Sequence, residues 1–235
     1  MGQKQSIIEK EKPYSKTDAT LYYFGGRGLA DQCRWLMAYT ETTFAQRVVS
    51  TRERFLKLSE SQLLFGQLPL LQIDGLELVQ SQAIVRHLAK RSNLCGNTPE
   101  EEAKCDMIAE CILDLVKVMT AIPFLRDKGQ DVGIMAEKWL KMAPRLEYCI
   151  ASNAGSPYLV GESVTYCDVL LAHVLTWFVE EAGGDLMKDF PLLVDLQILI
   201  LQKESLQRFL AGRQFYKVGD SAYCKQVSDV LGRKI

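Results

Sequence analysis

The first hundred residues alternate between short runs with a strand-like pattern and amphipathic segments with helical spacing. Strands are predicted at 20–24, 44–49, 68–73 and 76–79, and helices at 30–39, 51–60 and 81–90. Asp74 and Gly75 stand between the last two strands and are a strong signal for a two-residue hairpin turn. This order, βαβ followed by α and ββα, predicts a mixed four-stranded sheet with helices on its faces.

After residues 93–97 the strand-like runs stop, and the later hydrophobic patterns are helical. Thr98 is placed to cap a long helix that has Pro99 at its first position and extends to about Thr120. A helix at 134–152 contains Pro144, which we expect to kink or split it. The other predicted helices start at the capping box of Thr165 and Asp168, at 191 and at 205, and they end near 183, 201 and 210.

This change of pattern divides the chain into three parts. Residues 1–17 are polar, have no hydrophobic period and are predicted to form an N-terminal arm. Residues 18–96 are predicted to form an α/β domain, and residues 97–235 an all-helical domain.

Composition and charge narrow the classes of function. The 235 residues include 28 Lys or Arg and 29 Asp or Glu, and the net charge of −1 does not favour a general affinity for nucleic acid. No uncharged apolar stretch reaches the ~18–20 residues that cross a bilayer. The N-terminus also lacks the apolar segment of a secretory signal.

Cysteine and histidine usage gives no sign of a metal site. The seven cysteines are scattered without a C-x-x-C pair, and only two histidines are present, so no zinc spacing exists and no metal is expected. This usage favours structural thiols in a reducing compartment, which we interpret as the cytoplasm. A redox-active Cys33 is the weaker alternative.

The first six residues, Met-Gly-Gln-Lys-Gln-Ser, fit the myristoylation pattern M-G-x-x-x-[ST], a short pattern that also arises by chance. Nearby lysines at 4, 10, 12 and 16 would supplement a single acyl chain at a membrane, although Glu9 and Glu11 dilute their charge. Acylation of Gly2 with weak membrane association is therefore a hypothesis beside a purely cytoplasmic protein.

Three signals for chemistry are expected at one edge of the predicted sheet. Tyr23 precedes the turn Gly25–Gly28, where a phenol can point into a cleft. Pro69 leaves backbone groups of Leu68 unused, and a cis bond between them would offer these groups to a peptide, although a trans bond is the commoner arrangement. Ser81 is placed to cap a helix start that suits a carboxylate. Together these features suit a short peptide with an α-carboxylate and a thiol.

These residues stand in segments that resemble the tyrosine-type glutathione S-transferases. The resemblance is carried by the runs LYYFGGRG at 21–28, GQLPLLQIDG at 66–75, QSQAIVRHL at 80–88 and VGESVTYCD at 160–168. The chain is similar to the sigma, alpha and mu classes and to apicomplexan forms. The resemblance implies a thioredoxin-like N-terminal domain, an all-helical C-terminal domain and a homodimer. It also implies conjugation of the glutathione thiolate to hydrophobic electrophiles in detoxification, with glutathione as co-substrate and no cofactor.

The resemblance assigns roles to individual residues. It implies that Tyr23 is the catalytic tyrosine and that the bond between Leu68 and Pro69 is cis, with the Leu68 backbone pairing with the cysteinyl part of glutathione. Arg27 is expected to anchor structure at the domain junction. The other implied glutathione contacts are Lys57, Gln67, Gln80, Ser81 and Asp114, of which Asp114 reaches the glutathione of the partner subunit.

One position departs from the family pattern, because Leu29 stands where several classes have an arginine that assists the thiolate. We therefore expect thiolate stabilisation to depend more heavily on Tyr23. Met119, Phe124 and Phe215 are candidates for an electrophile site between the domains, and they fit plain core positions equally well. Two other functions stay open: a weakly active binder of haem or other apolar ligands, and a glutathione-dependent isomerase.

Overall fold

The computed structural model describes residues 19–126, 133–153, 155–212, 214–217 and 219–232. The predicted N-terminal arm, including Gly2, lies outside these residues. The strands are β1 (Ala19–Tyr23), β2 (Phe44–Val48), β3 (Leu70–Ile73) and β4 (Leu76–Val79). The helices are α1 (Asp31–Tyr39), α2 (Arg52–Ser61), α3 (Ser81–Arg91), α4 (Pro99–Arg126), α5 (Gly133–Ala151), α6 (Tyr166–Ala182), α7 (Pro191–Leu201), α8 (Glu204–Leu210) and α9 (Ser221–Leu231), with the short 3₁₀ helices η1 (Gly28–Ala30) and η2 (Asp185–Met187).

The four strands form the predicted mixed sheet, in the order β2-β1-β3-β4. Strand β1 is parallel to β2 and antiparallel to β3, and β3 is antiparallel to β4. Asp74 and Gly75 both have positive φ, 52° and 77°, as the predicted two-residue hairpin turn requires. The strand predicted at 68–73 starts two residues too early. Strand β3 is an inner strand, and Leu68 and Pro69 lie before it, outside the ladder.

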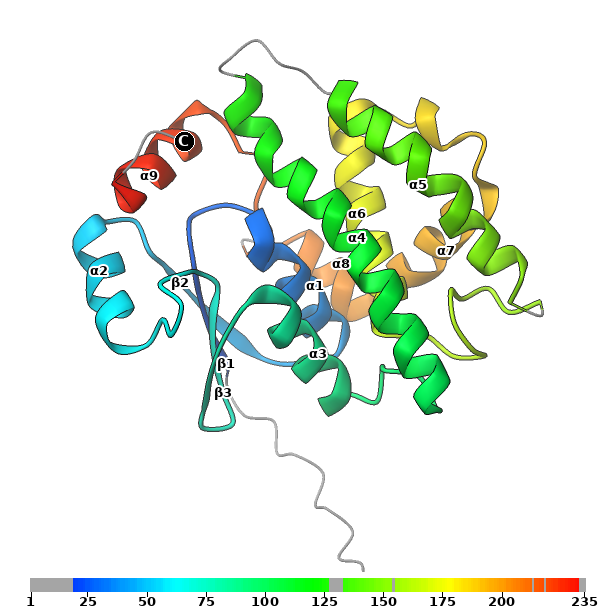
Figure 1. Ribbon diagram of the computed structural model, residues 1–235, viewed down its shortest axis with the longest axis horizontal. Coiled ribbons are helices and arrows are strands. Elements are labelled where there is room, and N and C mark those ends of the chain that lie inside the picture. Colours follow the sequence, from blue (N-terminus) through cyan, green and yellow to red (C-terminus); the bar gives the residue numbers. More distant parts are fainter. Residues whose placement is uncertain (1–18, 127–132, 154, 213, 218, 233–235) are drawn as a thin grey trace, which may run out of the picture.

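The elements form layers around the sheet (Figure 1). Helices α1 and α3 lie between the sheet and the helical half of the chain, whereas α2 lies on the opposite side of the sheet. All four strands precede residue 80, so the described part of the chain that follows is helical. This arrangement confirms the predicted fold class, a thioredoxin-like α/β part followed by an all-helical part. In the described part of the chain, no helix combines the length and the apolar character needed to cross a bilayer.

The long helices of the second half differ in part from the prediction. The hydroxyl of Thr98 accepts the N–H of Glu101 at 3.2 Å, as expected of a cap. Helix α4 does not end near Thr120, however, but continues through Pro123 to Arg126. Helix α5 also runs through Pro144 as one element and is not split there. A proline removes one backbone hydrogen bond, and the neighbouring turns, packed on the core, keep both helices continuous.

Helix α6 starts at the predicted capping box. The carboxylate of Asp168 accepts the N–H of Thr165 at 2.7 Å and its hydroxyl at 2.8 Å. Its other oxygen accepts the N–H of Leu159 at 2.8 Å, which ties the preceding loop to the helix. Burial raises the pKa of Asp168 to about 6, although these bonds favour the ionised form.

Replacing Asp168 with alanine is expected to lower the free energy of unfolding by about 2–4 kcal/mol, because buried N–H donors lose their acceptor at a helix start. Urea denaturation at about pH 8, where the carboxylate is ionised, measures this difference. The matched control is Asp185→Ala, since Asp185 is 88% exposed in an ion pair with Lys188. That change is expected to stay within about 0.5 kcal/mol, and equally small effects at both positions would contradict the prediction.

Candidate active site

Strand β1 ends at Tyr23, so that the phenol lies beside a tight turn. Alternation along β1 buries Leu21 and Tyr23 on the side of α1 and leaves Tyr22 half-buried on the other side. The Tyr23 hydroxyl oxygen accepts the N–H of Leu29 at 3.0 Å. Gly28 has φ of +47°, and a Cβ atom at this position would lie 2.3 Å from the Tyr23 hydroxyl. Only glycine therefore lets the backbone approach the phenol this closely.

This environment keeps the phenol neutral. Burial raises the pKa of Tyr23 to about 12, and the bond from Leu29 and the positive charge of Arg34 oppose this only in part. In the described part of the chain, the hydroxyl makes no further hydrogen bond beyond that with Leu29. Because the oxygen acts as acceptor towards Leu29, its proton is available for a ligand.

The strand register brings the other predicted groups to the same end of the sheet. Tyr22, Leu70 and Val79 stand opposite one another across β1, β3 and β4. The segments just beyond these three positions are 23–24, 68–69 and 80–81. They contain the phenol, the residues around Pro69 and the start of α3. Four of the predicted residues are thus at one sheet end: Tyr23, Leu68, Gln80 and Ser81.

The peptide bond between Leu68 and Pro69 is cis, as the family resemblance implies. Among the described residues, the backbone N–H and C=O of Leu68 find no hydrogen-bond partner. Next to it, the amide of Gln80 donates to the side-chain oxygen of Gln67 at 3.0 Å. A peptide could therefore pair with the free backbone groups of Leu68 as an added strand.

The start of α3 differs from the prediction by one residue. Gln80, with φ of 70°, is the N-cap residue, and Ser81 is the first residue of the helix. No side chain caps this end. The first intrahelical bond runs from the N–H of Ile84 to the carbonyl of Gln80, so three earlier N–H groups have no acceptor within the helix. Such an end attracts a carboxylate.

Two predicted glutathione contacts lie elsewhere. Lys57 is exposed on α2, where it lines a cavity of about 510 Å³ together with Tyr22 and Arg54. Because Tyr22 and Tyr23 point to opposite faces of β1, this cavity is on the side away from the Tyr23 phenol. Asp114 lies on α4 and is half-exposed, with Lys117 at 3.6 Å and Lys138 at 3.5 Å. These ion pairs are thus with lysines of its own chain.

The two halves of the chain match two family models. They are the glutathione S-transferase N-terminal domain, over residues 19–90, and the glutathione S-transferase C-terminal domain, over residues 116–213. Mouse glutathione S-transferase A4 is 33% identical over 216 residues, which are 90% of this chain and 96% of the mouse protein. The chain belongs to the glutathione S-transferase family.

Other relatives agree with this assignment. Human glutathione S-transferase A3 is 34% identical over 194 residues, which are 81% of this chain and 86% of the human protein. Among solved structures, the Na-GST-3 enzyme of the hookworm Necator americanus, described as monomeric, has a TM-score of 0.71 and 26% identity, over 84% of this chain and 98% of that one. The glutathione S-transferase of Ascaris lumbricoides has a TM-score of 0.70 and 27% identity, over 83% and 97% of the two chains.

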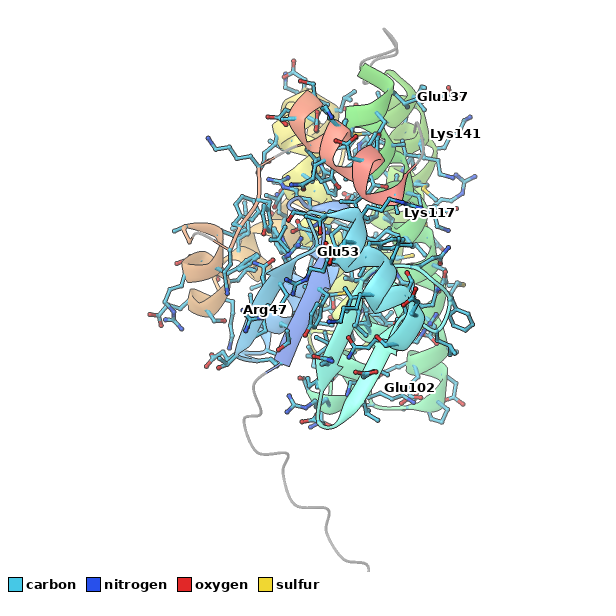
Figure 2. All side chains as sticks on the ribbon, turned by 90° about the vertical axis from the view of Figure 1, so that its left-hand side faces the viewer. Arg47, Glu53, Glu102, Lys117, Glu137 and Lys141 are labelled. Carbon is cyan, nitrogen blue, oxygen red and sulfur yellow. The ribbon has the colours of Figure 1, made fainter. Side chains whose placement is uncertain are left out.

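Helix α9 is the part of this glutathione S-transferase that the sequence analysis missed. The side chain of Gln226 accepts the N–H of Gly25 at 3.3 Å, and the ring of Tyr223 packs so closely on Gly26 that a Cβ atom there would lie 2.3 Å from it. Figure 2 shows α9 above α2, the helix that carries Glu53. Arg52 of α2 donates to the carbonyl of Val230 at 3.1 Å. Helix α9 therefore covers the turn that follows Tyr23.

A sequence signal for α9 exists. The carboxylate of Asp220 accepts the N–H of Tyr223 as an N-cap. Cys224, Val227 and Val230 are buried at helical spacing, and Gly232 follows the helix in the left-handed conformation. An acidic N-cap, apolar residues every three to four positions and a glycine after the last turn are standard signals for a helix and its two ends.

Arg27 lies at the junction of the two halves, as expected. It is 3% exposed, and it donates to Glu180 at 2.6 Å and to the carbonyl of Tyr216 at 2.7 Å. Its guanidinium also lies 5.4 Å from the ring of Trp177 and 4.6 Å from that of Phe215. Phe215 therefore packs against a charged group at the junction.

The other two electrophile-site candidates differ in exposure. Met119 is 1% exposed and belongs to the core. Phe124 is half-buried, and its ring centroid is 6.0 Å from that of Tyr223 on α9. Of the two, Phe124 is therefore the one that lies beside the cover formed by α9.

The remaining candidates for chemistry in the described residues are metal-ligating groups and the Cys33 thiol. No group of three or more His, Cys, Asp or Glu among them is placed to hold a metal ion. Burial raises the pKa of Cys33 to about 12, which is unfavourable for the reactive thiolate that the alternative interpretation required.

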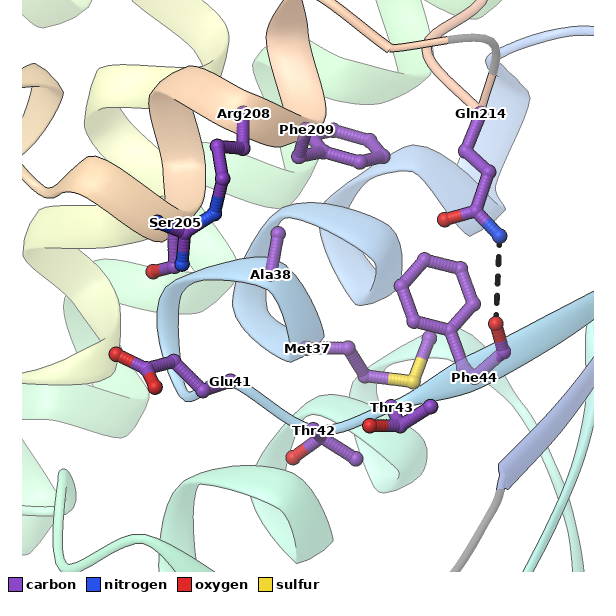
Figure 3. A pocket seen from close by; sticks show the side chains of 10 residues that line it. All are labelled: Met37, Ala38, Glu41, Thr42, Thr43, Phe44, Ser205, Arg208, Phe209 and Gln214. Atoms are coloured by element: carbon purple, nitrogen blue, oxygen red, sulfur yellow. Dashed lines mark hydrogen bonds between the residues drawn. The ribbon is translucent and has the colours of Figure 1, made fainter.

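A further cavity of about 500 Å³ lies at the C-terminal end of α1, between Met37, Phe44 and Phe209 (Figure 3). There the amide of Gln214 donates to the carbonyl of Phe44 at 3.3 Å. None of the predicted glutathione or electrophile contacts lines this cavity.

The Tyr23 phenol is expected to contribute no phenolate absorbance up to about pH 10, because its pKa is raised to about 12. The measurement is the ultraviolet difference between wild type and Tyr23→Phe during an alkaline titration, with tryptophan fluorescence as the check that both stay folded. A phenolate signal that appears in this difference below about pH 9 would contradict the prediction.

Proposed function

We propose that this protein is a glutathione transferase that joins the glutathione thiolate to hydrophobic electrophiles. The observation that carries the proposal is the neutral Tyr23 phenol with an unused proton, at the sheet end that also offers the Leu68 backbone and the start of α3. A phenol, a free backbone edge and an uncapped helix start match the thiol, the peptide groups and the γ-glutamyl carboxylate of glutathione.

The binding roles follow from this arrangement. The Leu68 backbone pairs with the cysteinyl part of glutathione. The γ-glutamyl carboxylate lies at the start of α3 with Ser81 and Gln80, and Gln67 holds the Gln80 amide in place. Lys57 and Asp114 are proposed as glutathione contacts from the family resemblance alone. Lys57 lies on the other side of the sheet, and Asp114 would act on the glutathione of a partner subunit.

The chemistry begins with the thiol. A free thiol has a pKa of about 8.5, so little thiolate is present at neutral pH. The Tyr23 hydroxyl donates a hydrogen bond to the sulfur anion, which lowers the pKa of the thiol, and the thiol releases its proton to water. The thiolate then attacks an electrophilic carbon, a C–S bond forms, and the electron pair leaves with the displaced group or is protonated after addition. Apolar side chains near the α9 cover, including Phe124, supply the electrophile side of the site.

Replacing Tyr23 with phenylalanine is expected to lower kcat for conjugation of an aryl halide by about 100-fold, because the hydrogen bond to the thiolate is lost. The dissociation constant for glutathione is expected to change by less than about threefold, since the backbone and helix contacts stay. Steady-state kinetics and calorimetry measure the two quantities.

The matched control is Tyr22→Phe. The hydroxyl of Tyr22 donates to Gln72 at 2.9 Å on the other face of β1, so its loss is expected to leave kcat nearly unchanged. A Tyr23→Phe enzyme as fast as wild type would exclude Tyr23 as the donor. Wild-type protein that neither binds glutathione nor turns over an electrophile would exclude the proposed function itself.

We further propose that the protein is a homodimer. Leu64 and Phe65, between α2 and β3, are 80% and 62% exposed in the single chain, which is unusual for large apolar side chains side by side. Sedimentation velocity is expected to give a dimer for wild type and a monomer for Phe65→Ser. Tyr148→Ser is the control, because Tyr148 is 70% exposed on α5. A monomeric wild type would contradict the proposal.

Acylation of Gly2 is also proposed, from the N-terminal motif and the lysines beside it. Co-expression with an N-myristoyltransferase is expected to add the mass of one myristoyl group to wild type and nothing to Gly2→Ala. Because one chain gives marginal attachment, only part of the wild-type protein is expected to sediment with membranes. An intact mass without this increase would end the proposal.

A further inference from the structure

A buried cation lies directly behind the Tyr23 phenol. Arg34, on α1, is 1% exposed, and its guanidinium carbon is 5.8 Å from the centroid of the Tyr23 ring. The ring of Tyr216 lies on it at 4.7 Å. A charge removed from water in this way acts strongly on its neighbours, since little solvent screens it.

The same guanidinium holds the turn that contacts the phenol. One nitrogen of Arg34 donates to the carbonyls of Gly26 and Arg27, both at 3.0 Å, and another donates to the side chain of Gln46 at 2.7 Å. The next two residues of this turn are Gly28 and Leu29, whose backbone lies against the Tyr23 oxygen. Arg34 therefore fixes the segment that orients the phenol.

The charge of Arg34 is balanced by a carboxylate of its own helix, which in turn contacts the other half of the chain. A carboxylate oxygen of Asp31 lies 3.2 Å from Arg34, and the second oxygen lies 3.1 Å from His173 on α6. Burial raises the pKa of Asp31, but His173 and Arg34 outweigh this effect, so that the pKa is below its ordinary value and the carboxyl is ionised. The cation and the phenol thus belong to one buried network that spans both halves.

We propose that Arg34 is a positioning residue for the proposed transferase reaction, which orients the Tyr23 phenol and stabilises the thiolate through the phenol ring. A positive charge behind the ring makes the hydroxyl a stronger hydrogen-bond donor to the sulfur anion. Leu29 brings no charge to the site, and its N–H orients the same oxygen. This inference rests on the proposed function.

Several other titratable groups surround Tyr23 and Arg34, and they have to be considered in any pH profile. They are Asp31 and Cys33 on α1, Arg27 in the turn, His173 on α6, Tyr216, and Tyr223 on α9. The test therefore uses variants that change the charge at one point and compares their profiles with that of wild type.

The decisive quantity is the pKa of the thiol of bound glutathione, read from thiolate absorbance and from the pH profile of kcat/KM for the electrophile at saturating glutathione. Arg34→Met keeps the volume and removes the charge, and it is expected to raise this pKa by about one pH unit, with about tenfold lower kcat/KM at neutral pH. Arg34→Lys keeps the charge and is expected to restore at least half of the shift. Asp31→Asn removes the balancing charge and is expected to lower the pKa by about 0.5 pH unit.

The control is Arg91→Met, because Arg91 is also largely buried and pairs with Asp74 at 2.7 Å, at the hairpin rather than at the phenol. It is expected to lose stability without moving the thiol pKa. A purely structural role of Arg34 predicts unchanged pKa values in all folded variants and would overturn the proposal. If Arg34→Met does not fold, the thiol pKa of Asp31→Asn decides the question. A lower pKa supports the proposal, and an unchanged or higher pKa contradicts it. If wild type itself forms no bound thiolate, the proposed function fails, and not this inference alone.

Discussion

The close contact between the Tyr23 oxygen and the backbone of Gly28 and Leu29 is the constraint on which the site depends. It requires β1 to end at Tyr23, a residue without a side chain at position 28, and a turn that returns directly into η1 and α1. The same contact occupies the acceptor side of the phenol, and its proton has no acceptor among the described residues. Strand, turn and helix therefore form one unit whose geometry determines the direction of a single O–H bond.

That unit is held from both halves of the chain. Buried polar contacts cross the junction from Asp31 to His173 and from Arg27 to Glu180, and an exposed ion pair joins Arg86 to Asp106 at 2.9 Å. A buried charge that loses its partner is costly, so the two halves are not free to slide against each other. Docking of the helical half is thus part of the definition of the site.

Local signals predicted much of this fold. The hairpin at Asp74, the capping box at Asp168 and the alternation around Tyr23 each depend on a few neighbouring residues, and the resemblance added the cis bond before Pro69. The errors have long-range causes. Gln80 adopts a positive φ, which cannot be predicted from its being a glutamine. The continuity of α4 beyond Thr120 depends on core packing, and the side of the sheet on which Lys57 lies depends on where α2 docks.

The cover over the turn joins residues that are 201 positions apart, because Gln226 binds Gly25. During synthesis, β1 and the turn leave the ribosome long before α9 does, and domains fold as their segments emerge. The nascent sheet end, with its phenol and unpaired backbone, therefore stays uncovered until α9 has been made. Closure of this end thus has to wait for the synthesis of α9.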